Sequence, residues 1–203
     1  MDQLTGSRPW IKTISPEISS PSLKDNTADV DRLLKGIEKN LQTESVSMDL
    51  SFAKRLPHDL RRYHYRVDAT VFEDKNGWHL IDIFPLNKGN RIHGLAVDLG
   101  SSTVVVRIAD LASLETEGEA SFHNPQVEIG TDILTRIHFA AQEGGLERLQ
   151  TLLVERLNRE IDQLAKKHGI TAGSIVAMSV AGNTTMTHLF LGLDPYWICR
   201  EPY

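Results

Sequence analysis

The feature that most constrains the fold is the stretch of residues 93–106, in which two apolar runs flank a short polar turn. Apolar runs of this kind are typical of strands buried on both faces of an α/β sheet. Asp98 lies where the first run ends, and Gly100 allows the backbone to bend sharply in the turn. We therefore expect residues 93–110 to form an antiparallel hairpin inside a mixed sheet.

The turn itself has the composition of a phosphate-binding loop. It offers the hydroxyls of Ser101, Ser102 and Thr103 together with several backbone N–H groups. Concave backbone donors beside a carboxylate, here that of Asp98, suit a polyphosphate with a hydrated Mg²⁺ ion. The alternative is a tight hairpin in which Asp98 forms an ordinary Asx-turn. The loop alone does not decide between these two interpretations.

Composition argues against several classes of partner. Of the 203 residues, 40% are hydrophobic and 24% are charged, which permits a packed core. The net charge is −5 and the pI is about 5.9, so nucleic acid and anionic membranes are poor partners. No apolar run approaches the roughly 18 residues of a membrane span, and no signal peptide is visible. The sequence therefore predicts a cytoplasmic protein.

Cysteine and histidine give no sign of a metal centre. Cys199 is the one cysteine of the sequence, which excludes an internal disulfide or a cysteine-ligated cluster, and we expect it to be inert. The eight histidines have no metal-ligand spacing, so we expect no direct metal site.

Composition and periodicity divide the chain into three parts. Residues 1–24 contain many prolines, serines and threonines, which predicts an extended linker that Ile11 and Ile14 could dock as a strand. We expect a small α+β domain over residues 25–90. A second, α/β domain follows over residues 91–203.

In the small domain, Asn26 or Thr27 is the expected N-cap of the first helix. The elements expected there are helices over 27–41 and 50–63 and strands over 64–73 and 78–84, joined by a turn at 74–77. In the second domain, the elements expected after the hairpin are a strand over 120–123, helices over 131–142 and 146–164, a buried strand over 174–181 and a helix ending at 191.

A second polar turn follows the strand over 174–181. It consists of Gly182, Asn183, Thr184 and Thr185. If this strand is parallel to the one ending at Asp98, both turns lie at carboxyl ends of neighbouring strands, where α/β sheets bind ligands. The helix N-terminus would then favour an anion. The alternative is an ordinary N-cap without a ligand.

Another polar cluster lies between the two turns. Residues 124–126, Asn-Pro-Gln, are adequately explained as a surface turn before a helix. Arg136 follows Asp132 by four residues, which predicts an exposed helix ion pair.

Three motifs taken together resemble the reductive activators of corrinoid-dependent proteins. They are residues 94–103, residues 124–137 and residues 182–192. The resemblance is strongest over residues 93–203 and weaker over 9–90. It implies the start of a domain of the acetate and sugar kinase, Hsp70 and actin class, with a ribonuclease-H-type sheet.

The resemblance also implies ATP and Mg²⁺ as cofactors. Asp98 would orient water bound to magnesium, and the loop from Gly100 through Ser101 and Ser102 to Thr103 would hold the β- and γ-phosphates. The turn from Gly182 through Asn183 and Thr184 to Thr185 would line the same cleft. The implied function is ATP-dependent return of a corrinoid from Co(II) to Co(I), on a corrinoid protein or a corrinoid-dependent methyltransferase. A homodimer is one assembly that the resemblance allows.

The sequence departs from this family in two respects. Full-length relatives hold a [2Fe–2S] cluster on four cysteines, whereas no cysteine precedes residue 93 here. The second phosphate loop and the adenosine pocket are also expected later in the chain than residue 203. We therefore expect half of a nucleotide site, inactive by itself. The alternatives are a fragment of a small-molecule kinase of the same superfamily and a docking module without catalysis.

Overall fold

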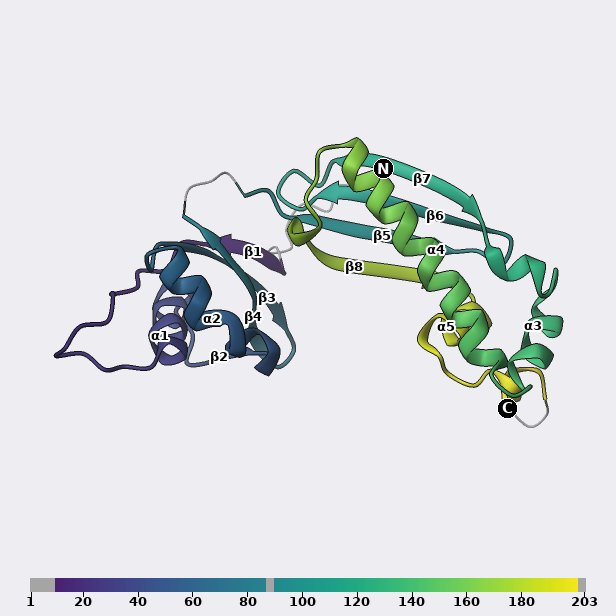
Figure 1. Cartoon of the computed structure of the whole chain (residues 1–203), viewed down its shortest axis with the longest axis horizontal. Helices are drawn as coiled ribbons and strands as arrows, with labels where there is room; N and C mark the ends of the chain where they lie inside the picture. Colours follow the sequence, from purple (N-terminus) through teal and green to yellow (C-terminus); the bar gives the residue numbers. More distant parts are fainter. Residues whose placement is uncertain (1–9, 87–89, 201–203) are drawn as a thin grey trace. The chain divides into compact units, whose positions relative to one another are not determined.

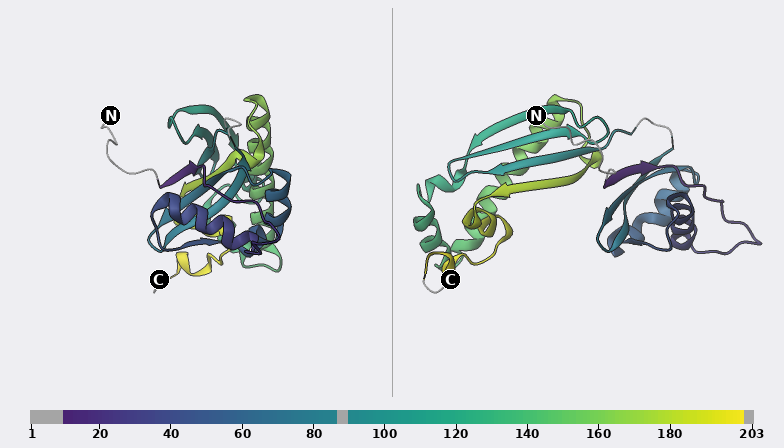
Figure 2. Two further views of the ribbon diagram at one scale, coloured as in Figure 1. Left: turned by 90° about the vertical axis from the view of Figure 1, so that its left-hand side faces the viewer. Right: turned by 180° about the vertical axis from the view of Figure 1, so that it is seen from behind.

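The chain folds into two compact units, Met1–Asn90 and Arg91–Tyr203. The computed structural model describes residues 10–86 and 90–200. Each unit contains a four-stranded sheet with helices against it, which confirms the predicted mixed α/β class (Figures 1 and 2). Within the described ranges, no helix is long and apolar enough to cross a membrane.

The first unit is built on a sheet of order β1-β3-β4-β2. β3 and β4 form an antiparallel hairpin at the predicted turn, with a bulge between Thr70 and Val71. β1 is antiparallel to β3, and the short β2 is parallel to β4. The elements are β1 (Ile11–Ile14), α1 (Asp29–Leu41), β2 (Val46–Met48), α2 (Leu50–Arg62), β3 (Val67–Asp74) and β4 (Gly77–Pro85).

The N-terminal segment differs from an extended linker. Ile11–Ile14 pair with β3, so this part of the segment is a strand of the first sheet, a docking that its isoleucines allow. The remainder of the expected linker up to residue 24 is largely without regular structure, and residues 1–9 lie outside the described ranges. The end of the first unit at residues 87–89 also lies outside them.

The start of α1 differs from the prediction as well. Its N-cap is Ala28, without a side-chain hydrogen bond, and neither Asn26 nor Thr27 caps it. The reason is that Thr27 donates from both its backbone N–H and its hydroxyl to the Asp25 carboxylate. The same carboxylate accepts from Arg32, which is buried. These bonds, rather than a capping side chain, fix the loop before the helix.

The second unit has a sheet of order β7-β6-β5-β8. β5 and β6 form the predicted antiparallel hairpin, β7 extends it, and β8 is parallel to β5. The elements are β5 (His93–Leu99), β6 (Thr103–Asp110), β7 (Thr116–His123), α3 (Ile133–Ala140), α4 (Gly145–Lys167), β8 (Ile175–Gly182) and α5 (Thr184–Leu191), with 3₁₀ turns at Pro125–Glu128, Ala172–Ser174 and Tyr196–Cys199.

The core of the second unit lies between the sheet and α4, which runs along one face of the sheet (Figure 1). The predicted leucine stripe of α4 supplies Leu149, Leu153 and Leu157, all buried. They pack into one cluster with Val104 and Val106 of β6 and with Met186 of α5. Burial of this stripe is what holds the helix against the sheet.

The opposite face of this sheet is open, which corrects the expectation of strands buried on both faces. Along β5, Leu95, Val97 and Leu99 are buried while Ala96 and Asp98 are exposed. Such alternation is typical of a sheet with a core on one face only. β8 is also far from fully buried, because it is an edge strand of this sheet and faces its open side with small residues.

Candidate functional site

The turn between β5 and β6 is tight enough to require glycine. A Cβ atom on Gly100 would lie 2.1 Å from the carbonyl oxygen of Thr103. The turn brings the exposed Ser102 and Thr103 and the half-buried Ser101 to one end of the sheet. Asp98 precedes them on the open face, where its side chain is exposed. A carboxylate and three hydroxyl-bearing residues therefore gather around one sharp backbone bend.

Asn124 and Arg136, which form a cluster of buried polar residues, hold the carbonyl groups of this turn, a support that the sequence did not predict. Asn124 donates from Nδ2 to the carbonyl of Gly100 at 3.0 Å, and its backbone N–H donates to the carbonyl of Ser102 at 2.9 Å. Arg136 donates from Nη2 to the carbonyl of Ser101 at 2.7 Å. Three successive carbonyl groups of the turn are thus fixed by side chain or backbone of two distant residues.

The carbonyl groups of this turn are bonded, whereas two of its N–H groups make no described hydrogen bond. In the described chain, the N–H groups of Ser101 and Ser102 donate in no backbone hydrogen bond. Successive free N–H groups in a concave bend are the feature that binds phosphate oxygens. The geometry of the turn therefore suits an anion, although Asp98 beside it requires a cation such as Mg²⁺ to accompany that anion.

Arg136 is central to this cluster, and its predicted role as an exposed ion-pair partner is wrong. Its side chain is fully buried and donates to the carbonyls of Gly130 and Ser101. Burial lowers the pKa of its guanidinium from the ordinary value. Asp132 instead caps α3 by accepting from the backbone and hydroxyl of Thr135, and these bonds lower its pKa. The spacing from Asp132 is misleading because the Arg136 side chain points to the turn after β5 and to the core, and not to solvent.

Asn124 and Gln126 are likewise buried, which corrects their interpretation as a surface turn. The Asn124 side chain accepts from the backbone N–H of Gln126, and Gln126 donates from Nε2 to the carbonyl of Leu149 in α4. Buried polar side chains with all these partners give a rigid support. The turn after β5 is therefore held by the core of the unit.

The second polar turn lies next to the first, as the parallel pairing of β5 and β8 predicts. Leu99 pairs with Gly182 in the register of the two strands. A Cβ atom on Gly182 would lie 3.0 Å from the Cβ of Leu99, so the strands approach closely here. Thr184 is exposed at the start of α5, whereas Thr185 is buried.

Asn183 fulfils the ordinary capping role that was the alternative to ligand binding. Its Oδ1 accepts from the backbone N–H of Met186 at 2.9 Å. That bond leaves its Nδ2 group available, and Asn183 is exposed. The capping bond fixes the direction of the first turn of α5, whose N-terminus adjoins the loop after β5.

A shallow hollow of about 280 Å³ lies on the open face beside Asp98. Its lining residues are Ala96, Val97, Asp98, Val105, Arg107, Ser179 and Ala181. Neither residues 100–103 nor residues 182–185 are among them, so the two turns lie at one end of the sheet and Asp98 alone of the predicted site residues lines this hollow. Arg107 is the cationic residue of the hollow and is paired with Glu119.

Taken together, the second unit is a mixed α/β domain with a glycine-bent, hydroxyl-rich turn at the carboxyl end of a central strand. Comparison with known proteins identifies the family. Residues 93–203 match the RACo middle region, and residues 6–90 match the RACo linker region. The chain belongs to this family.

Two relatives illustrate the similarity. The corrinoid activation enzyme RamQ of Eubacterium limosum is 31% identical over 179 residues, which are 87% of this chain and 29% of RamQ. The solved structure of a reductive activator for corrinoid, iron-sulfur protein is 33% identical and overlays with a TM-score of 0.83, covering 100% of this chain and 32% of that one. The chain thus spans about a third of the length of these relatives.

A structure of Ta0583, an archaeal actin homolog, overlays on 73% of this chain with a TM-score of 0.35 at 13% identity. An overlay of that quality carries no argument about fold. The actin, Hsp70 and sugar kinase class therefore stays an expectation from the motifs of the sequence.

Proposed function

We propose that this chain is the linker and middle part of an ATP-dependent reductive activator, which returns a corrinoid protein or a corrinoid-dependent methyltransferase from Co(II) to Co(I). The observation that carries the proposal is the overlay of this whole chain on 32% of a reductive activator at 33% identity. The relative RamQ, named as a corrinoid activation enzyme, supports the same role.

The turns after β5 and β8 supply one half of the nucleotide site in this proposal. The N–H groups of the Gly100–Thr103 turn bind phosphate oxygens, with Ser102 and Thr103 adding exposed hydroxyls. Asp98 orients water on magnesium, which prefers to keep several water ligands. Thr184 and the amide of Asn183 face the same end of the sheet from α5. A second lobe supplies the remaining contacts.

The buried cluster behind the turn acts as a positioning device. Arg136 and Asn124 fix the carbonyl groups of the turn, so its donors keep one arrangement before and after nucleotide binding. Preorganised donors stabilise phosphate charge without a reorganisation cost during the reaction. Binding energy from nucleotide is then available to drive the uphill reduction of the corrinoid.

A chimaera tests the proposal directly. Residues 10–200 replace the matching segment of the solved reductive activator, and a low-potential reductant is supplied as the source of the electron. The one-electron reduction of the corrinoid protein is followed by loss of the Co(II) electron paramagnetic resonance signal. We expect ATP-dependent loss of the signal in the chimaera, and no loss when it carries Asp98→Ala. The control is Asp162→Ala on the exposed side of α4. A folded chimaera that never reduces Co(II) would overturn the proposal.

A further inference from the structure

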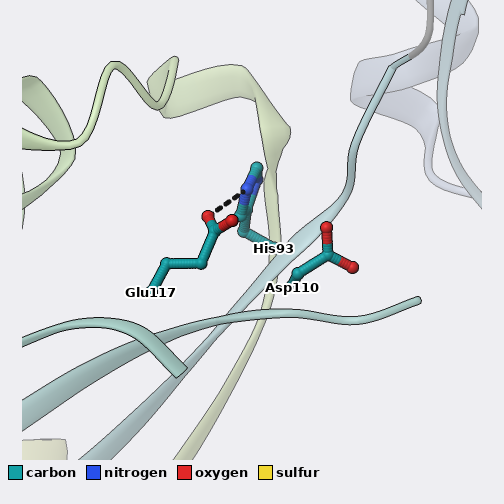
Figure 3. Close-up of side chains that lie close together, drawn as sticks. All are labelled: His93, Asp110 and Glu117. Carbon is teal, nitrogen blue, oxygen red and sulfur yellow. Dashed lines mark ion pairs between the residues drawn. The ribbon is translucent and has the colours of Figure 1, made fainter. Parts of the chain in front are cut away.

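A second cluster of charged groups lies at the opposite end of the same sheet. His93 begins β5, Asp110 ends β6 and Glu117 lies near the start of β7, and all three side chains converge (Figure 3). One ligand atom from each lies within 4.8 Å of the other two. Because the three come from separate strands, their sequence spacing gives no metal motif, and the sequence analysis did not expect a site on any histidine.

A hydrogen bond at Nδ1 orients the imidazole of His93. Its Nδ1 lies 2.9 Å from Oγ of Ser174, and that hydroxyl donates to the carbonyl of Thr171 at 2.8 Å. Since the hydroxyl proton is used on Thr171, Nδ1 of His93 is the donor to Ser174. This bond leaves Nε2 facing the carboxylates, where it offers a lone pair whenever it carries no proton. A hydrogen-bonded second nitrogen that fixes the ring is the usual arrangement of a metal-ligating histidine.

Nε2 of His93 faces an acceptor. It is buried, makes no hydrogen bond of acceptable geometry, and lies 3.0 Å from Oε2 of Glu117. The side chain of His93 is only 6% exposed. A lone pair and a carboxylate oxygen at that distance repel each other unless a cation lies between them. A buried group in this position therefore requires a proton or a metal ion.

The cation now at the cluster is the guanidinium of Arg91. It pairs with both carboxylates, donating from Nε to Oδ2 of Asp110 at 2.6 Å and contacting Glu117 through Nη2. Its side chain is 58% exposed, so it can leave toward solvent without crossing the core. While the imidazole of His93 is neutral, two carboxylates against one guanidinium leave one negative charge at the cluster, which a proton on Nε2 would balance. A divalent ion replacing Arg91 would neutralise both carboxylates.

The remaining bonds of Asp110 keep its free oxygen in place. Its Oδ1 accepts from the backbone N–H groups of Ala112 and Ser113, and these bonds, with the Arg91 contact, lower the pKa of the carboxyl. Oδ2 is held only by Arg91 among the contacts described for it. The carboxylate is therefore held in one orientation, with one oxygen that becomes available once Arg91 moves.

We propose that His93, Asp110 and Glu117 form a site for Zn²⁺ or a similar divalent transition metal, with Arg91 as a displaceable internal cation. One imidazole and two carboxylates are a zinc-type ligand set, which leaves a fourth position to water. Bonds of about 2.0–2.2 Å to the metal require the three ligands to close around the ion once the guanidinium of Arg91 has left the cluster. The ion would join β5, β6 and β7 at their common end.

Titration of the whole chain tests the site, in a Cys199→Ser background that removes the exposed thiol as a competing ligand. Zn²⁺ is followed by isothermal calorimetry, and Co²⁺ by its visible absorption. We expect one Zn²⁺ per chain, with Mg²⁺ unable to compete. Glu117→Gln should weaken Zn²⁺ binding at least about tenfold. Glu119→Gln, on the same strand but paired with Arg107 at the surface, is the matched control and should bind as the parent does.

Arg91→Ala separates a metal site from a purely structural ion cluster. It leaves all three ligands in place and removes the competing cation, so we expect tighter Zn²⁺ binding and a rise in Tm when Zn²⁺ is added. A structural cluster predicts a lower Tm that Zn²⁺ does not restore. The proposal is overturned if Arg91→Ala binds no stoichiometric Zn²⁺, or if Glu117→Gln and the parent bind it equally. Neither result bears on nucleotide binding.

Discussion

Replacing Arg136 by methionine tests whether the buried cluster holds the turn after β5. Methionine keeps much of the side-chain volume but removes the donors to the carbonyls of Ser101 and Gly130. Leaving a buried acceptor unsatisfied costs about 1–3 kcal/mol, so the two carbonyls together cost about 2–6 kcal/mol. Removing a buried charge that has no carboxylate partner in the described ranges offsets part of this loss. We expect a net destabilisation of about 2–4 kcal/mol.

Urea denaturation with hydrogen exchange read by mass spectrometry measures this change separately for the second unit. With an m-value of about 2 kcal/mol/M, the midpoint should fall by roughly 1–2 M. Exchange in the peptide containing Ser101 and Ser102 should accelerate in the native state. Arg159→Met, on the exposed face of α4, is the control and should change stability by less than about 0.5 kcal/mol. An Arg136→Met chain as stable as this control would refute the reasoning.

Three further predictions concern other parts of the fold. Gly100→Ala places a Cβ 2.1 Å from the Thr103 carbonyl, so the turn must open, and NMR shifts should move throughout it; a spectrum changed only at residue 100 would contradict this. Leu153→Ala removes a fully buried side chain of the second core and should cost about 2–5 kcal/mol in urea denaturation, a loss that a value below about 1 kcal/mol would contradict. The pKa of Asp25 is lowered chiefly by Arg32, so its carboxylate stabilises the first unit fully above about pH 4, and that stability is lost as the pH falls toward the lowered pKa. Asp25→Asn should abolish this acid-dependent part of the Tm profile, and an unchanged profile would argue against it.

The architecture of the second unit could be predicted because its local signals agree. The hairpin of β5 and β6 follows from two apolar runs around a glycine turn, and α4 follows from its leucine stripe. The parallel pairing of β8 with β5 follows from the helices between them. Burial of these strands was overestimated, because an apolar sequence does not reveal whether a second layer covers the other face.

The support of the candidate site could not be predicted from spacing. Arg136 lies four residues after Asp132, the pattern of a surface ion pair, and only the fold brings it to the carbonyl of Ser101. Asn124 reaches the carbonyl of Gly100 across 24 positions of the chain. Contacts of that range depend on how the hairpin and α3 pack together, which no short motif encodes.

The cluster around His93 was missed for a related reason. Its members begin or end different strands, and they converge because β5, β6 and β7 pair in register. A scan for histidine spacing along the chain examines one segment at a time. Antiparallel pairing is the information that such a scan lacks.

The measurement that tests the central claim most directly is calorimetric titration of the chain with Mg-ATP. We predict weak binding with a Kd of about 1 mM, since about 4 kcal/mol is what an exposed phosphate turn with no second lobe can supply. Asp98→Ala should abolish the heat without unfolding the chain, and Asp162→Ala should leave it unchanged. Micromolar binding, or binding that survives Asp98→Ala, would contradict the assignment of the turn after β5 as the phosphate site.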